Sequence, residues 1–368
     1  MSTVSFDSAR AALSPAVPDL ATGFHNWHTD TRSRVLEELT IFLRRVRVDE
    51  LRPAGVDEVL AQYAVGGKCV RSTFMYLGWL CVGEPDAAAL RAAASLELLH
   101  AFALLQDDVM DDAVLRRGSA AAHVRLSERH GGRDSAPKGF GMSAATLLGD
   151  MCLVWAEQML RESGLGEAAL ARLWPRYDAM RIELAVGQFA DLGNDIRESP
   201  NLDTVLEIAR AKSGNYTVRR PLELGAALAG ASERTLKALG QYGTRIGEAF
   251  QLRDDLLGIF GADSITGKPQ DSDLGQHKAT SVVVTALDMA MPATRRELSD
   301  LLHRPELDPA ALDRCRRLIA ASGAPERIED MIAERVDDAL RAIPDRAFGG
   351  DRRAALEQMA LLCTARQL

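Results

Sequence analysis

Apolar residues recur along most of this 368-residue chain at intervals of three and four, the spacing that places side chains on one face of an α-helix. The segment from Thr31 to Arg47 is typical, because Val35, Leu39 and Val46 would form one apolar stripe. Runs of β-branched residues, which favour strands, are scarce. The pattern predicts helices over residues 31–47, 56–64, 70–81, 87–110, 144–160, 166–190, 201–211, 216–229, 233–260, 279–288, 293–302, 309–321, 325–342 and 352–363.

Segments rich in glycine, proline and polar residues separate these helices. Residues 1–28 carry Ser, Pro and Gly among few apolar residues, so we expect a loosely ordered N-terminal extension. The clearest loop covers residues 130–141, and a second polar loop covers 261–278. No Pro/Gly/Ser-rich linker and no internal repeat of about 20–50 residues divides the remainder. Residues 29–368 are therefore expected to form a single all-α domain.

Composition and charge narrow the class of protein. The formal net charge of −8 argues against a nucleic-acid partner, since a phosphate backbone requires a basic stripe. No stretch approaches about 18 uninterrupted apolar residues, so no membrane span is expected. The first 20 residues lack the basic segment and apolar core of a secretory signal. Five scattered cysteines without a Cys-x-x-Cys pair indicate reduced thiols and a cytoplasmic location.

Two aspartate clusters carry the strongest chemical signal. Asp107, Asp108 and Asp111 follow an apolar stretch, and so does the pair Asp254 and Asp255. Asp107 and Asp111 are one helical turn apart and share a face. Carboxylates beside core-forming residues need a compensating partner, most simply a metal cation. Two such faces across a cavity could hold several Mg²⁺ ions and, through them, a diphosphate.

Basic residues stand close to both clusters in the sequence. Lys68 and Arg71 lie near an expected helix start, where backbone N–H groups and the helix dipole favour an anion. His100 precedes Asp107 by two helical turns, and Arg116 and Arg117 follow the first cluster. Carboxylates would bind the metal, the metal would bridge phosphate oxygens, and guanidinium groups would bind the remaining oxygens.

These motifs together resemble the trans-isoprenyl diphosphate synthases, the polyprenyl synthetase family that includes farnesyl and geranylgeranyl diphosphate synthases. The resemblance covers roughly residues 65–280. Within the family, the chain is most similar to the short-chain members. The resemblance implies one helical bundle around a central active-site cavity. It rests on ten motifs in the family's order: Gly66-Gly67-Lys68-x-x-Arg71, Glu97-Leu98-Leu99-His100, Asp107-Asp108-x-x-Asp111, Arg116-Arg117-Gly118, Leu148-Gly149-Asp150, Gly187-Gln188-x-x-Asp191, Lys212-Ser213, Gln251-Leu252-Arg253-Asp254-Asp255, Gly267-Lys268 and Asp273-x-x-x-x-Lys278-x-Thr280.

The resemblance also implies a reaction, head-to-tail transfer of an allylic prenyl group to isopentenyl diphosphate. It implies three Mg²⁺ ions, bound by Asp107, Asp111 and Asp254. The catalytic residues would be Asp107, Asp108, Asp111, Arg116, Lys212, Gln251, Asp254 and Lys268. The allylic diphosphate would be bound by Arg116, Lys212, Lys268 and Lys278, with Ser213 and Gln251 beside it. Isopentenyl diphosphate would be bound by Lys68, Arg71, His100 and Arg117.

The chain departs from the family pattern at a few positions. Gly258 stands where the second cluster usually has a third aspartate, and Gly275 and His277 alter the loop before Lys278. Product length in this family depends on side chains four and five residues before the first cluster, here Ala103 and Phe102. A single aromatic at the deeper position implies geranylgeranyl diphosphate (C20), with farnesyl diphosphate (C15) as the alternative.

The sequence was also compared with two other functional classes, a terpene cyclase and a non-catalytic partner subunit. A class I terpene cyclase would need a second metal motif, which begins at Asn194 but lacks the required residues at Glu198 and Leu202. A non-catalytic partner subunit would have eroded aspartate clusters.

The helix expected over residues 144–160 is more apolar than one packing face requires, and similar synthases pair in this region, so we expect a homodimer.

Overall fold

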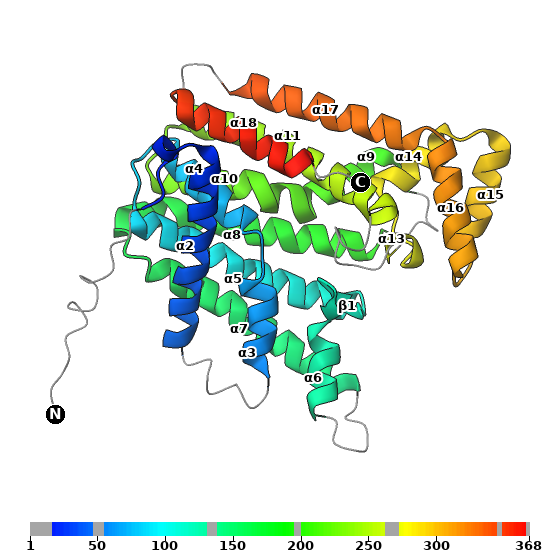
Figure 1. The fold of residues 1–368 in the computed structure, drawn as a ribbon, viewed down its shortest axis with the longest axis horizontal. Helices are drawn as coiled ribbons and strands as arrows, with labels where there is room; N and C mark the ends of the chain where they lie inside the picture. Colours follow the sequence, from blue (N-terminus) through cyan, green and yellow to red (C-terminus); the bar gives the residue numbers. More distant parts are fainter. Residues whose placement is uncertain are drawn as a thin grey trace.

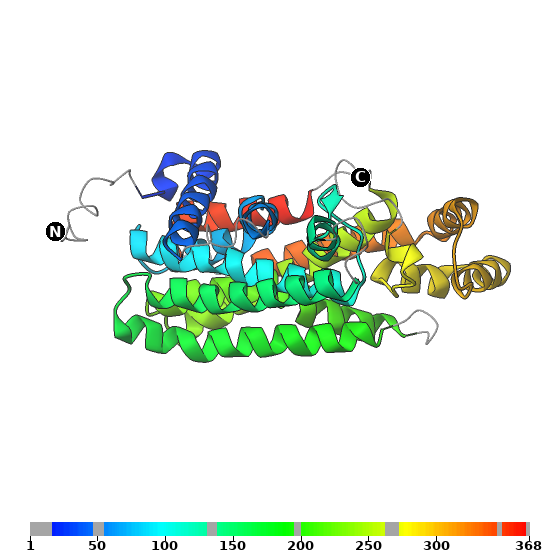
Figure 2. The ribbon, with the colours of Figure 1, turned by 90° about the horizontal axis from the view of Figure 1, so that it is seen from below.

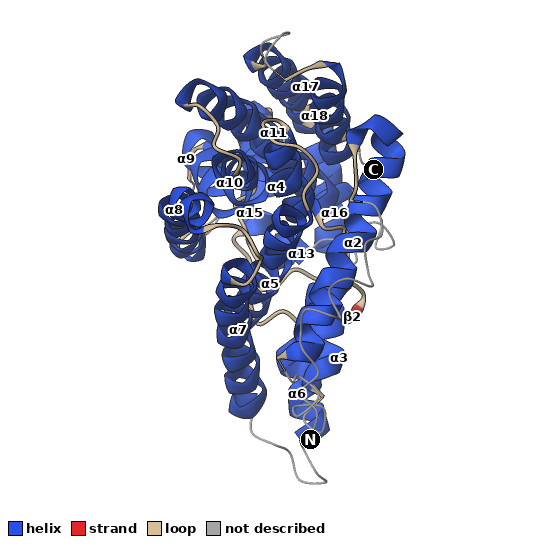
Figure 3. Ribbon diagram, turned by 90° about the vertical axis from the view of Figure 1, so that its left-hand side faces the viewer, coloured by secondary structure: helices blue, strands red, loops and turns tan. Residues whose placement is uncertain are grey.

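The computed structural model describes residues 17–46, 55–130, 138–194, 200–261, 272–343 and 348–365. Within these ranges the fold is helical apart from one two-stranded hairpin (Figures 1 and 3). The elements are η1 (Leu20–Thr22), α2 (Phe24–Arg45), α3 (Val56–Leu60), the π-helix η3 (Ala61–Val65), α4 (Val70–Leu80), α5 (Ala87–Met110), β1 (Leu115–Arg116), β2 (Ser119–Ala120), α6 (Ala122–His130), α7 (Lys138–Arg161), α8 (Glu167–Leu192), α9 (Leu202–Ala209), the π-helix η5 (Arg210–Arg219), α10 (Arg220–Leu228), α11 (Glu233–Phe260), α13 (Ser272–Gly275), α14 (Ser281–Met289), α15 (Pro292–Leu302), α16 (Pro309–Ala321), α17 (Ala324–Ala342) and α18 (Gly350–Thr364).

The predicted all-α, single-domain class is confirmed, and most helices begin and end near their expected residues. Three local differences stand out. α2 begins at Phe24 and buries Trp27 completely, so ordered structure starts before residue 29. α6 and the β1–β2 hairpin were not expected, and α7 starts inside the predicted loop. The helices expected over 201–211 and 216–229 form one continuous rod through η5.

α5 lies at the centre of the bundle and carries the first aspartate cluster at its C-terminal end. Its start is capped by Asp86, whose side chain accepts a hydrogen bond from the Ala89 N–H at 2.8 Å. Alanine and leucine follow on every side, and the helix is buried against α2, α4 and α7 (Figure 2). Dense packing therefore fixes the direction in which Asp107 emerges from the core.

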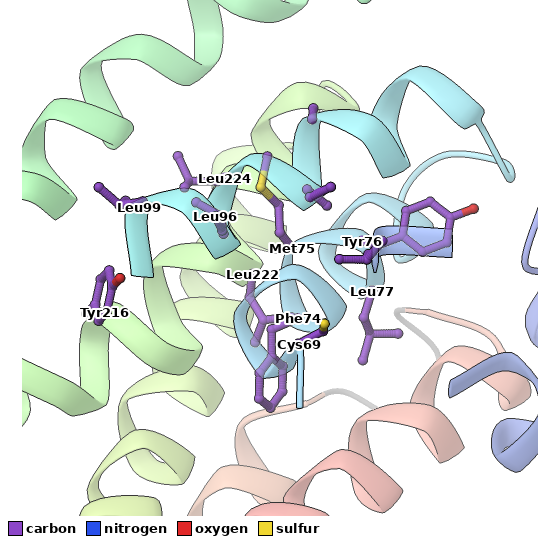
Figure 4. Packing of buried hydrophobic residues seen from close by; sticks show 14 of the residues in the cluster. Cys69, Phe74, Met75, Tyr76, Leu77, Leu96, Leu99, Tyr216, Leu222 and Leu224 are labelled. Carbon is purple, nitrogen blue, oxygen red and sulfur yellow. The ribbon is translucent and has the colours of Figure 1, made fainter. Parts of the chain in front are cut away.

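α4 and α10 cross at very short range because glycines lie at their contact. A Cβ on Gly225 would meet the Met75 carbonyl oxygen at 1.8 Å, and one on Gly78 would meet the Leu222 carbonyl oxygen at 2.3 Å. Figure 4 shows Met75 and Leu222 at this crossing, with Leu96 of α5 beside them. The close crossing joins the helix that follows Lys68 to the rod that contains η5.

α11 connects the two hydrophobic clusters of the molecule. Tyr242 and Ile246 belong to the main cluster, whereas Leu252 and Leu256 belong to the cluster formed with α14–α17. η5 lies directly against α11, since a Cβ on Gly247 would meet the Gly214 carbonyl oxygen at 2.4 Å. This contact brings the polar side chains of η5 and α11 to the same place between the clusters.

Two described helices meet the length and composition of a membrane span, α5 and residues 139–161 of α7. In α5, 67% of the most apolar 18-residue stretch is buried inside the fold, as expected for a core helix. Residues 139–161 of α7 are only 39% buried over their apolar window, and Leu147 and Val154 of this helix are exposed.

Candidate active site

A cavity of about 630 Å³ lies between the two hydrophobic clusters. Residues of α5, α8, η5 and α11 line it, together with the turn before α4 and the turn before α14. Most of the predicted site residues contribute to its lining: Lys68, Arg71, His100, Asp107, Arg116, Arg117, Lys212, Ser213, Gln251, Asp254 and Lys278. Segments more than 200 residues apart in the sequence therefore meet at one surface.

Four predicted residues do not line this cavity. Asp111 lies next to it, because its Oδ2 accepts a hydrogen bond from the lining residue Lys278 at 2.5 Å. Asp108 is fully buried on another side of α5. Phe102 and Ala103 are partly buried and pack against the main core cluster, whereas Leu104 lines the cavity. The remaining predicted residue, Lys268, lies outside the described residues.

The first aspartate cluster is held by cations from three other segments. Lys212 Nζ lies 3.1 Å from Asp107 Oδ1 and 2.6 Å from Asp191 Oδ2, so one ammonium joins η5, α5 and α8. Arg116 Nη2 lies 3.1 Å from Asp107 Oδ2. Burial alone would raise the pKa of Asp107, but Lys212 and Arg116 outweigh it and lower the pKa to about 2. Asp107 is therefore ionised at neutral pH.

Both aspartates of the second cluster, Asp254 and Asp255, line the cavity. Asp255 is buried and accepts hydrogen bonds from the Ser281 N–H at 3.0 Å, the Ser281 hydroxyl at 2.6 Å and Gln251 Nε2 at 2.8 Å. Burial, with a contribution from nearby Asp273, raises the pKa of Asp255 to about 6. Asp255 thus ties the start of α14 to α11.

A second part of the cavity lining is basic. The Arg71 guanidinium lies 4.5 Å from the centre of the Tyr216 ring and donates to the Thr217 hydroxyl at 2.9 Å. Burial, followed by the charges of nearby arginines, keeps the pKa of His100 well below its usual value, so its imidazole is neutral. Glu97 is buried beside this group and accepts from the Ser72 hydroxyl at 2.7 Å. Lys68, Arg71 and Arg117 give this part of the lining three cationic side chains beside the neutral imidazole, which suits an anionic ligand.

The donor set fits a magnesium ion, although the carboxylates are not gathered around one point. Among the described residues, no three or more His, Cys, Asp or Glu side chains lie close enough together to hold a metal ion. Asp107 and Asp254 nevertheless line the same cavity from α5 and α11, with Asp111 one turn beyond Asp107. Carboxylate oxygens are the ligands that Mg²⁺ prefers.

Several residues of the site had no predicted role. Glu97, Asp191 and Asp273 stand within recognised motifs, so their positions were visible in the sequence, but their contacts were not. Gln62 and Tyr63, which bond to the segment carrying Arg116 and Arg117, stand outside the motifs. A polar residue and a tyrosine just before Gly66-Gly67 were the available signal.

Comparisons with known proteins show the family to which the chain belongs. The family model for polyprenyl synthetase matches residues 54–319. A geranylgeranyl diphosphate synthase of Mycobacterium tuberculosis is 33% identical over 281 residues, which cover 76% of this chain and 75% of that protein. A geranylfarnesyl diphosphate synthase of Aeropyrum pernix is 32% identical, covering 76% and 84%. The crystal structure of a geranylgeranyl pyrophosphate synthase of Corynebacterium glutamicum, complexed with isoprenyl diphosphate and magnesium, is 34% identical with a TM-score of 0.82, covering 92% of this chain and 99% of that one.

Proposed function

The chain belongs to the polyprenyl synthetase family and is a prenyltransferase, and we propose that it makes geranylgeranyl diphosphate (C20) by Mg²⁺-dependent, head-to-tail (1′–4) condensation of isopentenyl diphosphate with an allylic diphosphate. The observation that carries the proposal is that two groups of charged and polar side chains line one cavity. Carboxylates with Lys212 form the first group, here called the acidic wall, and Arg71, His100 and Arg117 belong to the second, the basic wall. Two diphosphates can be bound side by side at such a pair of walls.

The acidic wall suits the allylic substrate. We propose that Asp107, Asp111 and Asp254 hold three Mg²⁺ ions, which when bound supply positive charge that stabilises the departing diphosphate. Lys212, Arg116 and Lys278 lie among these carboxylates and neutralise the same diphosphate. Lys268 is expected to assist them.

The basic wall suits isopentenyl diphosphate. Lys68 and Arg71 flank the turn into α4, and Arg117 packs against the preceding Gly66-Gly67 turn, where a Cβ on Gly66 would lie 3.3 Å from Arg117 Nη1. The neutral His100 donates or accepts a hydrogen bond without adding charge. Gln251 lies on α11 beside Asp254 and Asp255, where its amide helps to hold the allylic cation and the leaving diphosphate in register.

The proposed C20 product length rests on a side chain before the first cluster. The relatives include synthases named for C15, C20 and C25 products. Phe102 as the single aromatic before the first cluster supports C20 over the alternative, farnesyl diphosphate. The cyclase and non-catalytic alternatives lose support because the relatives are named as synthases and the basic wall is complete.

The test is a prenyl-transfer assay on the purified chain. With Mg²⁺ and labelled isopentenyl diphosphate, each allylic primer (dimethylallyl, geranyl and farnesyl diphosphate) should give a C20 product. Asp107→Ala and Asp254→Ala should reduce turnover by about 100-fold or more, whereas Asp300→Ala, an exposed carboxylate on α15, should not. Near-normal turnover of either site variant would refute the assigned metal ligands, and no transfer by the wild-type chain would refute the function.

We also propose that the protein is a homodimer in the cytoplasm. α7 and α8 are joined by an ion pair between Glu157 and Arg181. Their outer faces expose large apolar side chains: Leu147, Val154, Ile182, Val186, Phe189 and Leu192. An exposed apolar surface of this kind on adjacent helices fits a second copy of the chain. All five cysteines are buried as thiols, which supports a reducing compartment.

A further inference from the structure

The two arginines that face the cavity are carried by a very small hairpin. β1 and β2 have two residues each, with Leu115 opposite Ala120 and Arg116 opposite Ser119. Its turn needs left-handed backbone, at φ 53° for Arg117 and 74° for Gly118. An isolated two-stranded hairpin is at best marginally stable in water. Contacts from elsewhere must therefore fix the directions of Arg116 and Arg117.

Gln62 binds the hairpin at both of its ends. Its Nε2 donates to the Arg116 carbonyl oxygen at 3.0 Å and to the Ala120 carbonyl oxygen at 3.4 Å. In return, its backbone carbonyl oxygen accepts a hydrogen bond from Arg117 Nη1 at 2.6 Å. One residue of η3 thus holds the backbone under Arg116 and the side chain of Arg117.

Tyr63 fixes the same hairpin from the other side. Its hydroxyl donates to Asp108 Oδ2 at 2.5 Å and accepts from the Ala122 N–H, where α6 begins, at 3.0 Å. The other oxygen of Asp108 accepts from Arg116 Nε at 2.8 Å. Asp108 is 0% exposed and Tyr63 is 1% exposed, so this chain of bonds is shielded from water and strong.

Asp108 is therefore an anchor for Arg116, because its carboxylate does not line the cavity. Burial alone would lower the pKa of Arg116, but the hydrogen bonds and charge of Asp108 raise it above its usual value. Arg116 in turn reaches Asp107 at the cavity. A path of direct contacts runs from the Tyr63 hydroxyl to the acidic wall.

We propose that Gln62 and Tyr63 are positioning residues that aim Arg116 and Arg117 at the two substrate diphosphates, an inference that rests on the proposed function. They are consecutive in the π-helical turn η3, which directly precedes the Gly66-Gly67 turn and Lys68. A π-helix is rare and is frequently found at functional sites. Through it, the segment carrying Lys68 and the hairpin carrying both arginines are held to one another.

The main test compares two tyrosine-to-phenylalanine variants. Tyr63→Phe removes one buried hydroxyl and leaves Asp108 Oδ2 and the Ala122 N–H without that partner. Tyr242→Phe is the matched control, because the Tyr242 hydroxyl is equally buried but donates to the Leu356 carbonyl oxygen, and Tyr242 does not line the cavity. Tyr63→Phe should raise the KM of the allylic substrate about tenfold with a smaller change for isopentenyl diphosphate. Tyr242→Phe should leave both KM values unchanged.

Gln62→Ala supplies a second, independent variant. It removes the two bonds to the hairpin backbone but keeps the carbonyl oxygen that accepts from Arg117. Both KM values should rise, since the backbone under both arginines loosens. Circular dichroism and thermal melting of every variant will show whether the fold persists.

Calorimetric titration of inorganic diphosphate with Mg²⁺ separates this inference from the proposed function. Tyr63→Phe should bind diphosphate about tenfold more weakly than the wild-type chain. If the wild-type chain transfers prenyl groups while Tyr63→Phe and Tyr242→Phe behave alike, the positioning role is refuted and the function stands. If the wild-type chain shows no transfer, the function is refuted, and weaker diphosphate binding by Tyr63→Phe alone would still support the positioning role. Equal binding by all three proteins, or none, would overturn it.

Discussion

The carboxylate of Asp273 fills the space beside Gly258, where a Cβ would lie only 2.1 Å from Asp273 Oδ2. Gly258 is one helical turn after Asp254 on α11, and Asp273 lines the same cavity as Asp254. The glycine therefore leaves room for the Asp273 carboxylate of α13 to lie beside the second cluster. Asp273 is itself a motif residue, so the departure at position 258 lets a motif carboxylate approach α11 closely.

Gly258→Ala should consequently displace Asp273 from the cavity. Overpacking at this contact should lower the free energy of unfolding by about 1–3 kcal/mol and raise the Mg²⁺ concentration needed for half-maximal activity. The double variant Gly258→Ala/Asp273→Ala should regain stability without regaining the metal response. Gly139→Ala, in open space on α7, is the control. An unchanged Mg²⁺ response in Gly258→Ala would show that Asp273 has no part in the metal site.

His100 should make stability fall in mildly acidic solution. Its folded-state pKa lies well below 6.5 because burial and nearby arginines oppose its protonation. The unfolded chain binds the proton first, so the stability contribution is complete above about pH 6.5 and is lost as pH falls below it. Lowering the pH from 7.5 to 5.5 should therefore lower the free energy of unfolding. Chemical unfolding at several pH values should show a smaller loss for His100→Gln, and parallel curves would contradict the prediction.

Product length should respond to the side chains before the first cluster. Phe102→Ala removes a large ring from α5 and should shift the products toward C25 or longer, while Ala103→Phe should favour C15. Both leave the diphosphate walls intact, so total turnover should persist. Chromatography of the products provides the measurement.

Leu104→Ala tests whether Leu104 or Phe102 blocks further growth of the prenyl chain. Leu104 lines the cavity, whereas Phe102 does not. If only Leu104→Ala gives longer products, Leu104 is the side chain that limits product length. In that case Phe102→Ala should act only on stability, by about 3–5 kcal/mol.

Association should depend on the outer face of α7 and α8. Phe189 is 82% exposed there, and a charge in its place should oppose burial against a second copy. Light scattering at micromolar concentration should give a dimer for the wild-type chain and a monomer for Phe189→Arg. Met291→Arg, at a 74% exposed position before α15, should remain dimeric. A monomeric wild-type chain would disprove the dimer.

The sequence predicted long helices well because their periodicity is a local property. α11, expected over 233–260, begins and ends at those residues, and Ser232 caps it with a bond to the Thr235 N–H at 3.2 Å. Short elements were different. Nothing in the chain indicated that Arg117 would adopt left-handed backbone, and the hairpin depends on partners more than 50 residues away.

At Gly214, helix propensity alone gave a wrong prediction within the site. Glycine is a poor helix former, so a break was expected between 211 and 216. The structure instead uses Gly214 for close contact with Gly247, and the rod continues through η5. Motif residues could be named from the sequence, whereas the pairing of Lys212 with Asp107 and Asp191 required tertiary contacts.

The π-helix η5 makes the length of this part of the chain more critical than its composition. A π-helix bonds residue i to i+5, so it holds more residues per turn than the α-helices on either side. It therefore sets the angle, about the axis of the rod, between the Lys212 side chain and the side chains of α10, which follows Arg219. Deleting any one residue between 210 and 219 would rotate one side by about 100° against the other. Point substitutions on the outer face should therefore be tolerated where a single-residue deletion would disconnect α5 from η5.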